Sequence, residues 1–288
     1  MAILVTPTLE HLCRTALRKA GQVSPSTGMI QEAVSDQFMQ VMNDIKLKAP
    51  QHPLLETTEL KVTAVGVRSL SQPTKAHTTK SVLLFDGNTD WRGTAQTGAS
   101  TTITLAAAFS EDSNNIIGLQ IVTLGGTGSL QTRYITAYDN STKIATVDSA
   151  WTTTPDSTTT YLIVNYQNEI YSTSKQVMNY DSYKFASKGL PLMGAIEGET
   201  LWLDKPPDKI YPLYWTYYQD VDQIDWSSAL ALKILREWRT IIVEGVSAYS
   251  MDIYDDARST NEFQKYFIKL GLLVNETLDA VQTEPYDS

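Results

Sequence analysis

The feature that most constrains the fold is an abrupt change of sequence texture near residue 90. Residues 90–164 contain 17 threonines but only three basic and six acidic side chains. Short runs of alternating apolar and polar residues follow one another there, separated by clusters of turn-forming residues. Alternation with a period of two predicts half-buried strands, and the turn clusters predict hairpins between them. We therefore expect this segment to form a small β-barrel or sandwich of about five strands, inserted as a domain of its own.

On both sides of this segment the apolar residues recur at helical spacing instead. Four stretches show such a stripe: residues 9–20, 29–45, 230–249 and 263–278. Pro7 suits the first turn of the first helix, and Gly21 suits its end. The pattern predicts a helical hairpin near the start of the chain and a second pair of helices near its end.

Together these patterns predict an α+β protein with two domains. We expect residues 1–89 and 165–288 to form one domain, a bundle of N- and C-terminal helices joined to a β-hairpin region. Residues 90–164 are expected to form the inserted β-rich domain. The hairpin region is the tyrosine-rich stretch 201–218, in which Pro206 and Pro207 would stiffen the loop.

This stretch contains a strand with two different faces. Alternation places four residues on one face, namely Tyr211, Leu213, Trp215 and Tyr217. Tyr214 and Tyr218 then point to the opposite face, which we expect to be turned outward. One face would pack on the helices and the other would meet another subunit, because tyrosine and tryptophan are enriched at interfaces.

Composition argues against catalysis and against metal binding. With one cysteine, Cys13, and three histidines, the chain can form neither an internal disulfide nor a cysteine-based zinc site. Cys13 lies on the apolar stripe of the first helix, which favours a packed core thiol. The glycine-rich segment 125–128 lacks the Gly-Lys-Ser/Thr ending of a phosphate-binding loop, so a hairpin turn is the better interpretation. We expect no enzymatic activity, no catalytic residue, no metal and no cofactor.

Charge and hydropathy bear on nucleic-acid binding, membrane insertion and secretion. The net charge is −9, and residues 165–288 alone carry 11 basic and 19 acidic groups. The sequence has no basic stripe of the kind that grips phosphates, so specific nucleic-acid binding is not expected. No run approaches the roughly 20 apolar residues of a membrane helix, and the start lacks the basic region of a signal peptide. We expect a soluble protein, made in the cytoplasm and without a membrane anchor.

Three blocks of the sequence resemble the head-to-tail adaptor (connector) proteins of short-tailed double-stranded-DNA bacteriophages. The first block is residues 12–25, in which ALRKAG (16–21) is similar to the end of the family's first helix. The second is ETLWLDKPPD (199–208), running into the tyrosine-rich strand. The third is the closing pair of helices, with Glu237-Trp238 and DDAR (255–258). Separately, parts of residues 93–155 resemble a β-module inserted in various phage structural proteins.

The resemblance implies a structural protein of the virion, located in its neck and made in the host cytoplasm. It implies a homo-oligomeric ring of about twelve copies, in which each subunit shows different patches to its two neighbours. The ring would bind the portal protein on one side and tail nozzle, tube or fibre proteins on the other. Genomic DNA would pass through its lumen without specific binding.

Nine residues are candidates for contacts with these partners. They lie on the exposed face of the first helix, on the outward face of the strand and in the C-terminal tail: Arg14, Arg18, Lys19, Tyr214, Tyr218, Thr283, Glu284, Pro285 and Tyr286. The alternative is a tail-associated recognition protein whose inserted β domain binds a host glycan or a fibre. A third hypothesis, a virion hydrolase, would require a catalytic carboxylate pair that no spacing in the sequence picks out.

Overall fold

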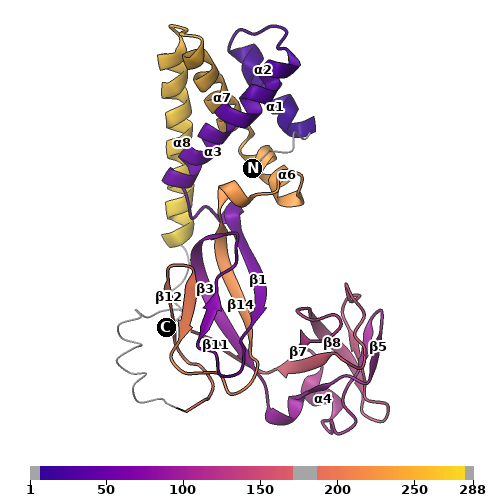
Figure 1. Cartoon of the computed structure of the whole chain (residues 1–288). Helices are drawn as coiled ribbons and strands as arrows, with labels where there is room; N and C mark the ends of the chain where they lie inside the picture. Colours follow the sequence, from indigo (N-terminus) through magenta and orange to yellow (C-terminus); the bar gives the residue numbers. More distant parts are fainter. Residues whose placement is uncertain (1–6, 171–186, 283–288) are drawn as a thin grey trace. The chain divides into compact units, whose positions relative to one another are not determined.

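The computed structural model describes residues 7–170 and 187–282, and it confirms the predicted α+β class. Helices and several antiparallel sheets make up the chain (Figure 1). Two compact units can be separated. The helical unit consists of Met1–Thr57, Lys75–Thr78 and Tyr217–Ser288, and the sheet unit consists of Thr58–Thr74 and Thr79–Thr216. The proposed domain boundaries at residues 90 and 164 do not coincide with this division and stay a prediction.

The helical unit contains the helices that the apolar stripes predict. Its elements are α1 (Pro7–Lys19), α2 (Thr27–Glu32), η1 (Ala33–Gln37), α3 (Phe38–Lys48), η2 (Pro53–Leu55), η4 (Val221–Gln223), α6 (Ala229–Glu237), α7 (Arg239–Ile253) and α8 (Ser259–Gln282). The π-helical turn η1 joins α2 to α3, so the stripe at 29–45 belongs to one continuous helical stretch. Gly21, with a φ of 100°, follows the end of α1 as expected.

A single hydrophobic core holds these helices together. The stripe of α1 is fully engaged in it, because Leu9, Cys13 and Ala16 are all completely buried. Helix α7 packs against both α1 and α8 and also touches α3. At Gly245 the approach is closest, since a Cβ atom there would lie 2.4 Å from a methyl carbon of Val41.

The tyrosine-rich stretch does not form the predicted hairpin. Strand β13 (Thr200–Leu203) pairs with β12 (Gly194–Glu197) and β2 (Ser69–Ser71) in a three-stranded sheet. Strand β14 (Pro212–Gln219) belongs to another sheet, of order β1-β14-β3-β11. The remaining strands of that sheet are β1 (Glu56–Val62), β3 (Ala76–Asp86) and β11 (Tyr166–Glu169). The two prolines in the connection cannot donate ladder hydrogen bonds, and the chain crosses between sheets there.

Residues 90–164 form a seven-stranded antiparallel sheet of order β4-β10-β7-β8-β9-β6-β5. Its elements, with the preceding short helix, are η3 (Thr89–Trp91), β4 (Arg92–Thr94), β5 (Thr97–Ala99), β6 (Thr102–Thr104), α4 (Ser113–Ile116), β7 (Gln120–Gly125), β8 (Thr132–Asp139), β9 (Ile144–Val147) and β10 (Thr160–Val164). The expected strands are present, and two short ones are added. Gly126 and Gly128 have positive φ in the connection between β7 and β8, which confirms the turn predicted there.

Two hydrophobic cores serve the seven-stranded sheet. One lies wholly within residues 90–164 and includes Ile103, Leu105 and Tyr161. The other is shared with the four-stranded sheet, because Phe85 of β3 joins Val122 of β7 and Leu162 of β10 in one buried cluster. The segment therefore has a core of its own and is also packed against the strands that precede and follow it.

Candidate functional site

The single cysteine is packed into the core of the helical unit. Cys13 is completely buried, and burial raises the pKa of its thiol to about 12. A thiol with such a pKa stays protonated at neutral pH and is a poor nucleophile. Within residues 7–170 and 187–282, no group of three or more His, Cys, Asp or Glu side chains could hold a metal ion. Several surfaces of the described residues could dock other molecules.

Of the three basic candidates on α1, Arg18 is exposed, while Arg14 and Lys19 are partly exposed, at 38% and 33% of their side chains. The Arg14 guanidinium lies 2.7 Å from the Glu10 carboxylate one turn earlier, and Arg18 is exposed. Lys19 instead forms ion pairs with Glu244 of α7 and, at 2.7 Å, with Glu262 of α8. Lys19 is therefore already paired within the helical unit, because the end of α1 packs against neighbouring helices that present carboxylates to it.

The outward orientation expected for Tyr218 is wrong, whereas Tyr214 is half-buried and borders an open cleft. Tyr218 is only 7% exposed and belongs to the core of the helical unit. Tyr214 is half-buried, with its ring edge-to-face against Phe85 at 4.7 Å between centroids. Strand β14 lies between β1 and β3, so both of its edges are paired, and all of its residues except Tyr214 and Thr216 are buried. The candidates Thr283, Glu284, Pro285 and Tyr286 lie outside the described residues.

Sequence reasoning missed an apolar stripe on the accessible face of α8. Phe267 is 52% exposed, Ile268 68%, Leu272 57% and Leu278 53%. These residues fall within one broad face of the helix, opposite the buried positions Tyr266, Leu270 and Leu273. Exposed large apolar side chains grouped on one helix face make this surface a candidate for docking. The signal was present in the sequence, because apolar residues occupy more than one stripe of the 263–278 segment.

A second surface lies between α1 and α6. A cavity of about 380 Å³ is lined there by seven residues: Thr8, His11, Leu12, Leu232, Leu235, Arg236 and Arg239. Leu232 is 47% exposed at this surface. Helix α7 packs against both α1 and α8, the helices that carry the two surfaces (Figure 1).

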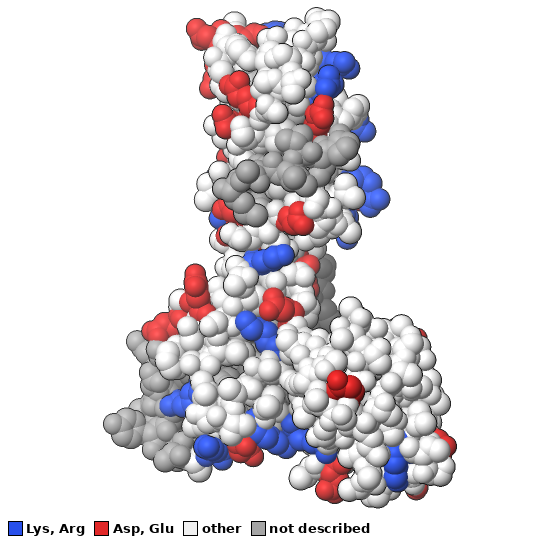
Figure 2. All heavy atoms as spheres, turned by 45° about the vertical axis from the view of Figure 1, so that its right-hand side comes forward, with Lys and Arg blue, Asp and Glu red and all other residues white. Residues whose placement is uncertain are grey.

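Exposed charged side chains are unevenly distributed over the helical unit. Basic side chains of α1 and α6, among them Arg18 and Arg236, are exposed on the side of the cavity. The turn between α7 and α8 exposes Ile253 and Tyr254 next to the acidic Asp252 and Asp255. Figure 2 shows Lys and Arg mainly along one edge of the helical part and Asp and Glu mainly along the other.

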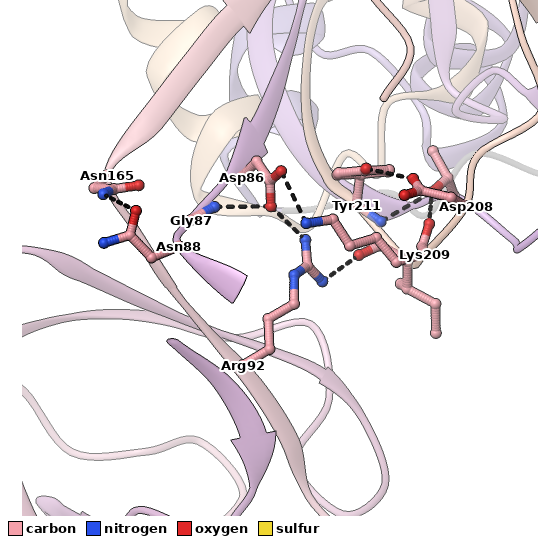
Figure 3. Close-up of polar contacts among 10 residues, drawn as sticks. Asp86, Gly87, Asn88, Arg92, Asn165, Asp208, Lys209 and Tyr211 are labelled. Carbon is pink, nitrogen blue, oxygen red and sulfur yellow. Dashed lines mark hydrogen bonds and ion pairs between the residues drawn. The ribbon is translucent and has the colours of Figure 1, made fainter. Parts of the chain in front are cut away.

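A polar cluster secures the point where the chain enters the seven-stranded sheet (Figure 3). Asp86, at the end of β3, accepts hydrogen bonds at 2.8 Å from Arg92 Nη2 and from the amide of Gly87. The other oxygen of Asp86 lies 3.1 Å from Lys209 Nζ. Arg92 Nη1 donates a further bond, at 2.6 Å, to the carbonyl of Ile210. One carboxylate thus joins two segments that are far apart in the sequence.

The aromatic ring of Tyr211 completes this cluster. The charged groups of Arg92 and Lys209 lie 5.3 and 5.4 Å from its centroid, within cation–π range. Its hydroxyl donates to Asp208 at 2.6 Å, and burial raises the pKa of Tyr211, so the group remains protonated. Nearby, Asn165 donates to Asn88 at 3.1 Å and links the entry and exit strands of residues 90–164. The cluster can hold this segment in a fixed orientation, and it offers no reacting group.

No protein-family model matches the chain, and no curated protein is significantly similar to it. In the part of the chain that the structure describes, none of the helices has the length and apolarity needed to cross a membrane.

Proposed function

We propose that the chain is a structural virion protein, a subunit of a ring-forming head-to-tail adaptor. The ring would join the portal to the tail nozzle or tube and line the channel through which DNA leaves. In this proposal the helices form a bundle that builds the ring body, and residues 90–164 form a small barrel or sandwich attached to it. The role is structural and not enzymatic, and the location is the virion neck.

The observation that carries this proposal is the pair of unlike surfaces on the helical unit. A closed ring is built from heterologous contacts, in which one patch of each subunit meets a different patch of the next. The apolar stripe at Phe267, Ile268 and Leu272 is one such patch, and the cavity between α1 and α6 is the other. A symmetric dimer would need only one self-complementary patch.

Basic residues lie at the cavity, and acidic residues lie at the turn that precedes α8. Arg236 and Arg239 line the cavity, whereas Asp252 and Asp255 flank the exposed apolar turn between α7 and α8. Opposite charges at the rim of an interface steer association and disfavour wrong pairings. The acidic balance of the chain suits a channel that DNA passes without being held, since tight phosphate binding requires a basic stripe.

The decisive experiment measures assembly on the portal. Mass by light scattering and negative-stain images would be recorded for the protein alone and after mixing with the portal ring of the same virus. We expect a ring to form on the portal with wild-type protein. We expect Ile268→Glu to block it, because the variant places a charge in the apolar stripe. Val23→Glu is the matched control, because Val23 is 84% exposed in the helical unit and lies outside both surfaces.

Two results would contradict the proposal. The first is a wild-type protein that does not bind the portal but binds the distal tail or host glycans. This result would favour the recognition alternative. The second is a ring that forms equally well with Ile268→Glu. Thermal unfolding of both variants verifies that they are folded, and an exposed position such as Ile268 is expected to tolerate the charge.

A further inference from the structure

An open cleft lies in the sheet unit, where the four-stranded and seven-stranded sheets meet. Its volume is about 530 Å³, within the range of small-molecule sites. Three tyrosines and three side-chain amides line it: Tyr134, Tyr166, Tyr214, Gln120, Asn165 and Gln167. Apolar side chains, among them Leu83 and Val164, form the rest of the wall. None of the assembly surfaces described above includes this cleft.

Two of the tyrosine rings are available to a ligand. Tyr134 is 50% exposed and Tyr166 is 43% exposed, although both border a concave surface. Tyr214 differs from them, because its ring already packs edge-to-face on Phe85. An aromatic side chain offers an apolar face and, in tyrosine, a polar hydroxyl, and such residues dominate sites where one side of a ligand is apolar and the other is wet.

The cleft is preformed by contacts behind its lining. Gln120 donates to the Tyr134 hydroxyl at 2.8 Å, and the amide of Tyr134 donates to Asp148 at 2.9 Å. Asn165 is held at 3.1 Å by its bond to Asn88 (Figure 3). Val164 and Tyr214 belong to the hydrophobic cluster that joins the two sheets. A site whose groups are already ordered loses less conformational entropy when a ligand binds.

The side chains that line the cleft indicate which class of ligand fits it. No Lys, Arg, Asp or Glu lines the cleft, so phosphates, nucleotides and other ions find no countercharge there. Side-chain amides both donate and accept hydrogen bonds, as sugar hydroxyls do. The rings of Tyr134 and Tyr166 can cover the C–H face of a pyranose, which is apolar. We propose that the cleft binds a neutral saccharide, with stacking on these rings and hydrogen bonds to Gln167 and Asn165.

The test uses the full chain and a defined set of sugars. Saturation-transfer NMR would be recorded with glucose, galactose, mannose and N-acetylglucosamine and with their α- and β-linked disaccharides. We expect transfer to at least one of these sugars. In Tyr166→Ala and Tyr134→Ala the affinity for that sugar should fall about tenfold or more, because a stacking face is removed. Tyr166→Phe should retain binding, since it keeps the ring.

A matched control and a second readout make the test decisive. Tyr254→Ala removes a tyrosine of similar exposure, 47%, from the helical unit and should bind as the wild type does. The inference is overturned if no sugar in the set receives saturation, or if binding survives in both alanine variants. It does not rest on the adaptor proposal, because Ile268→Glu, which should fail to assemble, is expected to bind the sugar normally.

Discussion

At the scale of single residues, Gly245 shows how strongly the helical unit depends on one missing side chain. A Cβ atom there would meet a methyl carbon of Val41 at 2.4 Å and the ring of Tyr266 at 2.8 Å. We predict that Gly245→Ala lowers the free energy of unfolding by about 1–3 kcal/mol, because α7 must move away from α3. Urea unfolding followed by circular dichroism measures the change.

Gly271 provides the control, because a Cβ atom at this helical position meets nothing within 4 Å. Gly271→Ala should stabilise the protein by up to about 1 kcal/mol through helix propensity alone. The two glycines are thus expected to respond with opposite signs. A Gly245→Ala variant as stable as the wild type would show that the close packing of α7 on α3 is absent in solution.

Glu262 is expected to make stability depend on acid pH. The hydrogen bond from Lys19, together with one from Lys265, lowers the pKa of its carboxyl from 4.5 to about 2. Because the folded state holds this proton less tightly than the unfolded state, the stabilisation is complete above pH 4.5 and is lost as pH falls toward 2. Glu262→Gln should therefore cost about 2 kcal/mol at pH 7 and progressively less in acid.

Unfolding in urea at several values between pH 7 and pH 2.5 would measure this difference. Glu32→Gln, at an exposed position of α2, is the control and should follow the wild-type curve. A constant gap between wild type and Glu262→Gln over the whole range would contradict the linkage to this carboxyl.

At the scale of elements, the connection between β3 and β4 depends on the Asp86–Arg92 cluster. We predict that Arg92→Leu costs about 1–3 kcal/mol, because the partly buried Asp86 carboxylate loses a charged partner. Hydrogen exchange should become faster at residues 86–92 and 165–170, while β8 and β9 keep their protection because their core is separate.

Arg18→Ala, an exposed change on α1, should leave hydrogen exchange unaltered in both regions. If hydrogen exchange in Arg92→Leu also becomes faster throughout β8 and β9, the seven-stranded sheet is not stable by itself. Its stability then depends on the Asp86–Arg92 cluster. That outcome would remove the basis for treating residues 90–164 as a separate domain.

The elements differ in how far they follow from local sequence. Helix α1 was predictable, because its buried residues recur at i, i+3 and i+4 and one stripe decides the burial of each position. Strand β14 was not, because residues on both of its faces are buried, and alternation then carries no information about which face is outward. The pairing of β13 with β2 also had no local signal, since these strands are far apart in the chain.

At the scale of the whole molecule, assembly is the property that the two unlike surfaces of the helical unit suggest. The apolar α8 stripe had a sequence signal, but its exposure follows only from which stripe of α8 faces α7. The cavity between α1 and α6 combines residues that are more than 200 positions apart and could not be inferred from either helix. The ring experiment with Ile268→Glu tests the molecule at this scale.

The sequence by itself determined the α+β class, the places of the helices and the strand-rich character of residues 90–164. These depend on periodicity and turn chemistry, which act between residues close in the chain. Only the tertiary structure decided that Lys19 is drawn into ion pairs, that Tyr218 is buried and that three tyrosines from separate strands line one cleft. Such features depend on which distant segments pack together, and packing is decided by the sum of many weak contacts across the chain.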